Sequence, residues 1–107
     1  MEHVSPAELA TWLADASRAR PFLLDVREPW EYDTCHIEGS VLIPMHTIPA
    51  RIDDLDEDAV IVCICHHGMR SMQVAAFLER HGFSQLSNLT GGIHAWANQV
   101  DHAMAKY

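Results

Sequence analysis

Short apolar runs alternate with polar stretches along the chain, and this pattern predicts the elements of the fold. Four of the runs are short, rich in leucine and β-branched residues, and bounded by turn-forming or charged residues, so we expect them to form strands. They cover residues 22–26, 41–43, 60–64 and 86–89. Because the run 60–64 is apolar at every position, it is typical of a strand buried on both faces at the centre of a parallel sheet.

Helical patterns precede, separate and follow these strands. Ser5, Pro6 and Glu8 form a good helix start, since serine can cap a helix, proline suits its first position and glutamate can complete a capping box. Apolar residues then recur at positions 9, 12, 13 and 16, which is helical spacing. Further helical stretches are expected after Pro29 and over residues 48–55, 69–81 and 93–100.

A single α/β domain accounts for this order of elements. The 107 residues suit one domain, because two halves would each be too small to bury a useful core. Strands that alternate with helices predict a mostly parallel sheet with helices on both faces. No repeat, linker or low-complexity segment divides the chain, so we expect one domain over residues 1–107.

Composition and charge narrow the function. The chain carries 7 Lys and Arg against 15 Asp and Glu, a formal net charge of −8, so we expect no nucleic-acid or membrane partner. The longest apolar run, residues 59–65, falls far short of a membrane span. Three cysteines do not make a disulfide scaffold and residues 1–20 do not resemble a signal peptide, so we expect a cytoplasmic protein with free thiols.

Candidate chemistry lies where the strands end, because open α/β sheets bind ligands beyond the carboxyl ends of their strands. Asp25-Val26-Arg27 ends the first predicted strand, and Thr90-Gly91-Gly92 follows the last. The central strand is followed by Cys65-His66-His67-Gly68-Met69-Arg70-Ser71, in which a cysteine precedes a glycine-containing loop and a helix start. This third segment is the strongest candidate for a site.

The chemistry of that loop makes Cys65 a candidate nucleophile. The thiolate is the reactive form of cysteine, whose ordinary pKa is about 8.5. Inward-pointing loop amides and the start of the next helix would stabilise negative charge there, and Gly68 permits the sharp turn. Arg70 can present a planar fork to an oxyanion, and His66 and His67 can donate hydrogen bonds or carry charge at slightly acid pH.

Other interpretations of these residues stay open. Cys65 could be a small buried residue at a strand end. Cys63, Cys65, His66 and His67 offer metal ligands, but Cys63 should point into the core and no second Cys/His pair stands at ligand spacing, so no metal is expected. The acidic segment 53–58 lacks the glycine and terminal glutamate of a calcium loop and is interpreted as a solvated turn.

Taken together, the motifs resemble the rhodanese family of sulfurtransferases. Cys65-x-x-Gly68-x-Arg70-Ser71 after an apolar strand looks like that family's active-site loop. Three further stretches agree, in family order: Leu24-Asp25-Val26-Arg27-Glu28, His36-Ile37-x-Gly39-Ser40 followed by Ile43-Pro44, and Leu89-Thr90-Gly91-Gly92-Ile93-x-Ala95-Trp96. The resemblance covers residues 4–98 and implies a single rhodanese-like domain with a five-stranded parallel sheet flanked by helices.

The resemblance also implies a reaction. Cys65 would take the outer sulfur of a donor such as thiosulfate and become a persulfide, and cyanide or a cellular thiol would then accept that sulfur. Arg70 would lie near the donor's sulfonate, while Asp25 and Arg27 would support the loop, with Glu28, Glu31 or Glu38 as candidate partners of Arg27. The substrate-binding residues would be His66, His67, Gly68, Met69, Arg70 and Ser71, whose amides cradle the persulfide. No cofactor is implied, and a sulfur-relay protein is a further candidate partner.

Three alternatives accompany this interpretation. Phosphatases and arsenate reductases that share the fold have one more residue between cysteine and arginine, whereas four residues separate Cys65 from Arg70 here, which suits a sulfur atom better than phosphate or arsenate. A non-catalytic interaction or sulfur-carrier module of the same fold would usually lack the loop cysteine. Cys35 could serve as a second thiol near the loop, although an ordinary, partly exposed cysteine is the favoured interpretation.

Overall fold

A five-stranded parallel sheet forms the middle layer of the molecule, in a computed structural model that describes residues 1–107. The strands run in the order β1-β5-β4-β2-β3, and every neighbouring pair is parallel. Their bounds are β1 Glu2–Val4, β2 Phe22–Asp25, β3 Val41–Leu42, β4 Ile61–Ile64 and β5 Leu86–Leu89. The fold class expected from the sequence is therefore confirmed, with β4 at the centre.

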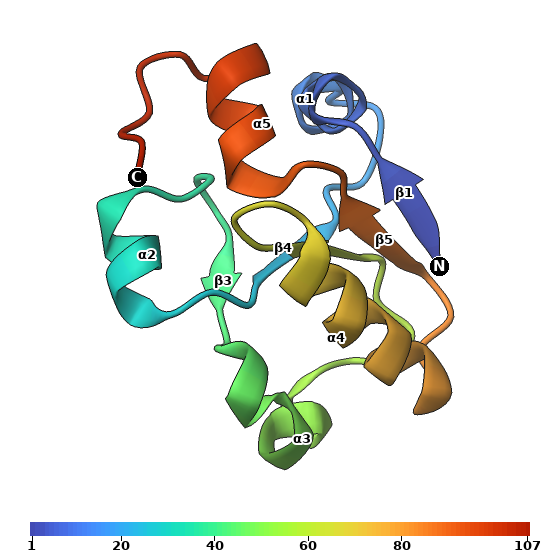
Figure 1. Cartoon of the computed structure of the whole chain (residues 1–107). Helices are drawn as coiled ribbons and strands as arrows, with labels where there is room; N and C mark the ends of the chain where they lie inside the picture. The colour runs from blue at the N-terminus through green and yellow to red at the C-terminus, as the bar shows by residue number, and fades with distance from the viewer.

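Four α-helices connect successive strands, and a fifth, α5, follows β5 (Figure 1). They are α1 Pro6–Ala14, α2 Pro29–Thr34, α3 Ile48–Arg51, α4 Met69–Arg80 and α5 Gly92–Gln99, and a short 3-10 turn lies on each side of α3. The capping box at the start of α1 is present, with Ser5 and Glu8 each accepting a hydrogen bond from the other's backbone N–H. Even α4, the longest helix at 12 residues, is too short to cross a bilayer, and no helix combines the length and apolar character that a span requires.

The sequence pattern missed one strand, β1. It contains only three residues, two of them exposed, and it pairs with the edge of β5 through Glu2, His3 and Val4. An alternation of three residues is too short to stand out before the helix start at Ser5. The strand closes the sheet on the side away from β3.

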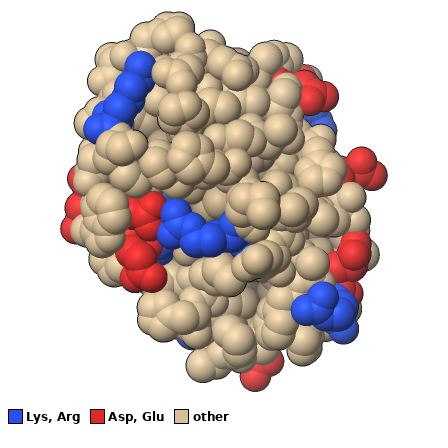
Figure 2. Space-filling model, in the orientation of Figure 1, with Lys and Arg blue, Asp and Glu red and all other residues tan.

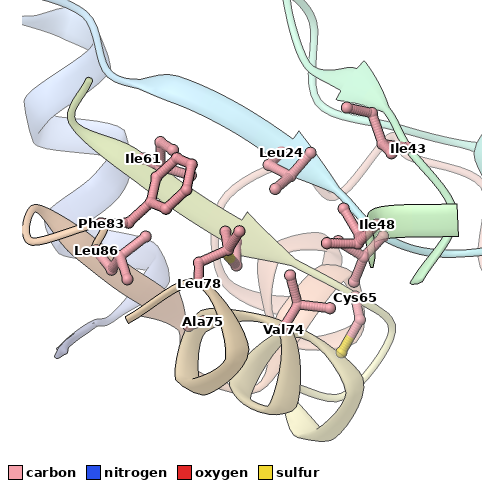
Figure 3. Packing of buried hydrophobic residues seen from close by; sticks show 12 residues of the cluster. Leu24, Ile43, Ile48, Ile61, Cys65, Val74, Ala75, Leu78, Phe83 and Leu86 are labelled. Carbon is pink, nitrogen blue, oxygen red and sulfur yellow. The ribbon is translucent and has the colours of Figure 1, made fainter. Parts of the chain in front are cut away.

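The two faces of the sheet carry separate apolar layers. One layer contains Ile61, Cys63 and Cys65 from the central strand and its extension, packed against Val74 and Leu78 of α4 (Figure 3). The other contains the intervening residues of the strand, packed against α1 and α5, and includes Val62, Ile64, Leu9, Ile93 and Trp96. Successive side chains along a strand point to opposite faces of the sheet. Cys65 therefore projects to the same face as Ile61 and Cys63.

Candidate active site

Cys65 follows β4 directly and its sulfur is enclosed by the loop that leads into α4. The residue is 1% exposed. The N–H of Gly68 donates to its Sγ over 3.0 Å, and the hydroxyl of Ser71 lies 3.2 Å from the same atom. The Gly68 N–H and the start of the 12-residue helix α4 stabilise negative charge on a sulfur atom held there.

Gly68 and Asn88 fix the shape of this loop. Gly68 has a φ of 101°, a conformation that glycine adopts without strain, and it stands immediately before α4. The side-chain amide of Asn88 donates to the Gly68 carbonyl over 3.1 Å, while its oxygen lies 2.5 Å from the Ser71 hydroxyl. The buried strand β5 therefore holds both groups that contact the Cys65 sulfur.

The start of α5 fixes the loop from its other side. The N–H groups of Ile93 and His94 donate to the carbonyls of Cys65 and His66, both over 2.9 Å. A side chain at Gly92 would collide with those two carbonyl groups. These contacts leave the loop carbonyls turned towards α5, which explains the need for glycine in the Gly91-Gly92 pair at this point.

Arg70 lies in the first turn of α4, where it forms an ion pair with a carboxylate. Its two terminal nitrogens donate to the two oxygens of Glu31 over 2.7 and 2.8 Å. The hydrogen bonds with Arg70 lower the pKa of Glu31 to about 2, although burial opposes this shift. The same pairing raises the pKa of Arg70, although burial opposes this shift.

Asp25 and Arg27 form a buried ion pair. Both side chains are fully buried, and Arg27 donates to the Asp25 carboxylate over distances of 2.7–3.1 Å. The sequence-based candidates for its partner, the carboxylates of Glu28, Glu31 and Glu38, are wrong. Of these three residues only Glu31 is bonded to Arg27, and it accepts through its backbone carbonyl, because its side chain faces Arg70.

Tyr107 joins the two arginine–carboxylate pairs. Its hydroxyl accepts a hydrogen bond from Arg27 and donates one to Glu31, both over 2.8 Å. Its ring stacks on His66 with centroids 4.0 Å apart. Burial is the main reason that the pKa of Tyr107 rises to about 12.

The loop histidines form a cluster with a third histidine from α5. The rings of His66 and His67 lie 4.0 Å apart, and His94 lies 5.0 Å from His67. Burial lowers the pKa of His66, so that ring stays neutral near pH 7. Met69, the remaining loop residue, is 63% exposed, so its side chain is turned to solvent.

The three cysteines occupy different environments. Cys63 is completely buried in the apolar layer, and that burial raises the pKa of its thiol to about 12, in keeping with a core residue. Cys35 is 9% exposed, more buried than the sequence indicated, and packs in the layer on the opposite face of the sheet from Cys65. All three thiols are free. No three His, Cys, Asp or Glu side chains converge in a geometry that could hold a metal ion.

Sequence reasoning did not assign Asn88, Glu31 or Tyr107 to the site. Asn88 gave one usable signal, since it is a polar residue between leucines in a short predicted strand. The sequence offers Glu31 only as a candidate partner of Arg27. Tyr107 lies in a tail without periodicity, and its contacts with Arg27 and Glu31 span 80 and 76 positions of the chain.

Comparison with known proteins agrees with this architecture. The sequence-family model of the rhodanese-like domain matches residues 5–99, so the chain belongs to the rhodanese-like family. It is 35% identical to a sulfurtransferase from Allochromatium vinosum over 97 residues, covering 91% of this chain and 89% of that protein. It is 39% identical to the thiosulfate sulfurtransferase GlpE from Pseudomonas fluorescens, covering 69% of this chain and 68% of that protein.

A longer relative and a solved structure extend the comparison. The probable adenylyltransferase/sulfurtransferase MoeZ from Mycobacterium tuberculosis is 40% identical over 106 residues, which is 97% of this chain. The chain spans only 26% of the length of that relative. A rhodanese-like domain protein from Staphylococcus aureus superposes with a TM-score of 0.84 at 30% identity, covering 94% of this chain and 95% of that one. Sulfur transfer by a rhodanese domain is thus the general activity that these relatives support.

Proposed function

We propose that this chain transfers sulfane sulfur through a persulfide on Cys65, from thiosulfate or a related donor to cyanide or a thiol. The observation that carries the proposal is the enclosure of the Cys65 sulfur by the Gly68 N–H at 3.0 Å and the Ser71 hydroxyl at 3.2 Å. A site of this kind favours an anionic sulfur both before and after reaction. The resemblance of the chain to named sulfurtransferases supports the same chemistry.

The reaction has two balanced steps. The Cys65 thiolate attacks the outer sulfur of thiosulfate. The sulfur–sulfur bond of thiosulfate breaks, and sulfite leaves with the electron pair of that bond. An acceptor thiolate or cyanide then attacks the outer sulfur of the persulfide and regenerates the Cys65 thiolate. Neither step needs an added oxidant or reductant, and neither needs a cofactor.

The remaining loop residues hold the persulfide. Amides from His66 to Ser71 would cradle its outer sulfur, as the Gly68 N–H contacts the inner one. Met69 contributes its backbone, since its side chain is exposed. Asp25 and Arg27 act as positioning residues, because Arg27 binds the carbonyls of Glu31 and Cys35 and so fixes α2 beside the loop.

A relay role is the proposed biological setting. Relatives of this chain include MoeZ and a putative sulfur carrier protein, YrkF, from Bacillus subtilis, which supports a protein donor or acceptor in addition to small molecules. We place the activity in the cytoplasm, where the three free thiols would stay reduced. Nucleic acid and membranes are not expected partners at a formal charge of −8.

The test combines a thiocyanate-forming assay with intact-mass analysis after exposure to thiosulfate. We expect the mass to rise by one sulfur atom on Cys65, and Cys65→Ser to lose at least about a hundredfold in turnover, because no nucleophile remains. Cys35→Ser serves as the matched control, because its side chain packs on the opposite face of the sheet, and it should keep near-normal turnover. Full turnover in Cys65→Ser, or added sulfur on another cysteine only, would contradict the proposal.

A further inference from the structure

Arg70, the arginine of the cysteine loop, is already paired within the protein. Arg70 contributes two hydrogen bonds to Glu31, at 2.7 and 2.8 Å, in the planar two-point geometry that guanidinium groups also form with sulfonates and phosphates. The Glu31 side chain is only 5% exposed, while that of Arg70 is 36% exposed. A substrate anion that reaches Arg70 must therefore compete with a carboxylate that is fixed in place.

Glu31 is fixed by more than Arg70. The N–H of Glu28 donates to one of its oxygens over 3.0 Å, and the hydroxyl of Tyr107 donates to the other over 2.8 Å. The pKa of Glu31 lies far below neutrality, so the carboxylate is charged at every pH at which a thiolate enzyme works. This carboxylate cannot be neutralised to release Arg70 under those conditions.

No other arginine at the site is free to replace Arg70. The five N–H groups of Arg27 are all used, by Asp25, the carbonyls of Glu31 and Cys35, and Tyr107. His66 is kept neutral by burial. On the face of the molecule drawn in Figure 2, basic side chains stand alone or lie against acidic ones. They form no continuous basic surface there.

Resting on the sulfur-transfer function proposed above, we propose that Glu31 makes the site discriminate between sulfur donors by charge. Thiosulfate carries its negative charge on a sulfonate that needs a partner such as Arg70, and Glu31 opposes its binding. An organic persulfide with an uncharged carbon skeleton needs no such partner and is the favoured class of donor. Glu31 is thus a specificity-determining residue that does not itself react.

The favoured step balances without a further reagent. The Cys65 thiolate attacks the outer sulfur of R–S–SH, and the bond between the two donor sulfurs breaks. The organic thiolate leaves with the electron pair, and the proton stays on the transferred sulfur. Cys65 becomes the persulfide that the thiosulfate reaction also produces, so a single mass measurement follows both donors.

The experiment measures the rate at which Cys65 gains one sulfur from thiosulfate and from 2-hydroxyethyl persulfide. In Glu31→Gln we expect kcat/KM for thiosulfate to rise on the order of tenfold, mainly through a lower KM, because a charge-assisted hydrogen-bond competitor is lost. Loading from the uncharged persulfide should change less than about twofold, since that donor makes no use of Arg70. Asp33→Asn is the matched control, because it removes one negative charge from an exposed position of the same helix, and it should leave the ratio of the two donors unchanged.

Two further variants separate specificity from structural damage. In the double variant Glu31→Gln/Arg70→Ala the gain with thiosulfate should disappear, because it depends on the released guanidinium. If Glu31→Gln does not fold, Glu31→Asp, whose shorter side chain weakens the two-point pairing, should show a smaller gain in the same direction. An unchanged donor ratio, or an equal loss with both donors, would overturn the inference, whereas failure of both donors to load Cys65 would instead contradict the proposed function.

Discussion

Two arginine–carboxylate pairs flank the loop, and they differ in one respect that decides their roles. Asp25 and Arg27 are completely buried and Arg27 has no unused N–H group, whereas Arg70 is 36% exposed and contributes only two hydrogen bonds, both to Glu31. The first pair can do nothing but hold the chain together. The second pair has the same chemistry but opens to solvent, so it can respond to a ligand.

Breaking the sealed pair gives the largest expected effect. Arg27→Ala leaves Asp25 as a buried charge without a partner, and such losses cost about 3–5 kcal/mol of stability. Denaturant unfolding measures the change. Arg51→Ala is a suitable control, because the Arg51–Asp54 pair is exposed and should contribute less than about 0.5 kcal/mol. A loss in Arg27→Ala as small as that in the control would mean that the buried pair is not structural.

The contribution of the Arg70–Glu31 pair to the free energy of unfolding should depend on pH. The pKa of Glu31 falls from an ordinary 4.5 to about 2 in the folded chain, so its stabilising contribution is complete above pH 4.5 and is lost as the pH falls towards 2. Glu31→Gln should cost on the order of 2 kcal/mol at neutral pH, after allowance for the exposure of Arg70, and progressively less on acidification. Urea unfolding at pH 7 and pH 3 tests this, and a cost that does not change with pH would contradict it.

The connection between the pairs gives the smallest effect. Tyr107→Phe removes the hydroxyl that joins Arg27 to Glu31 but keeps the ring that stacks on His66. We expect a loss of about 1 kcal/mol in unfolding free energy, the usual contribution of one hydrogen bond. In alkaline titration followed by tyrosine absorbance, the late ionisation due to Tyr107, whose pKa is about 12, should disappear. Unchanged stability together with an unchanged titration curve would contradict the connecting role.

The sequence was a good guide wherever the signal was local. The central strand, the loop after it and the helix start at Met69 all follow from residues within ten positions of one another, and the structure has them where the pattern predicts. The capping box of Ser5 and Glu8 is local in the same way.

The pairing of charges was not predictable for the opposite reason. A count of charges over residues 60–82 gives a small positive excess, from Arg70 and Arg80 against Glu79. In the structure Glu31, 39 positions away in the chain, pairs with Arg70 and neutralises the positive charge of the loop. Only the folded chain shows that Glu31, which precedes the second predicted strand, and Arg70 of the loop are neighbours.

The alternation of β4 sets a rule for changes in chain length. Ile61, Cys63 and Cys65 project into the layer that contains α4, and Val62 and Ile64 into the other. Inserting or deleting one residue within this strand would turn Cys65 towards α1 and α5, whereas a change of two residues would restore its side. The chemistry proposed for the loop therefore depends on whether the number of residues in β4 changes by an odd or an even amount. The length of this strand matters as much as the identity of the cysteine.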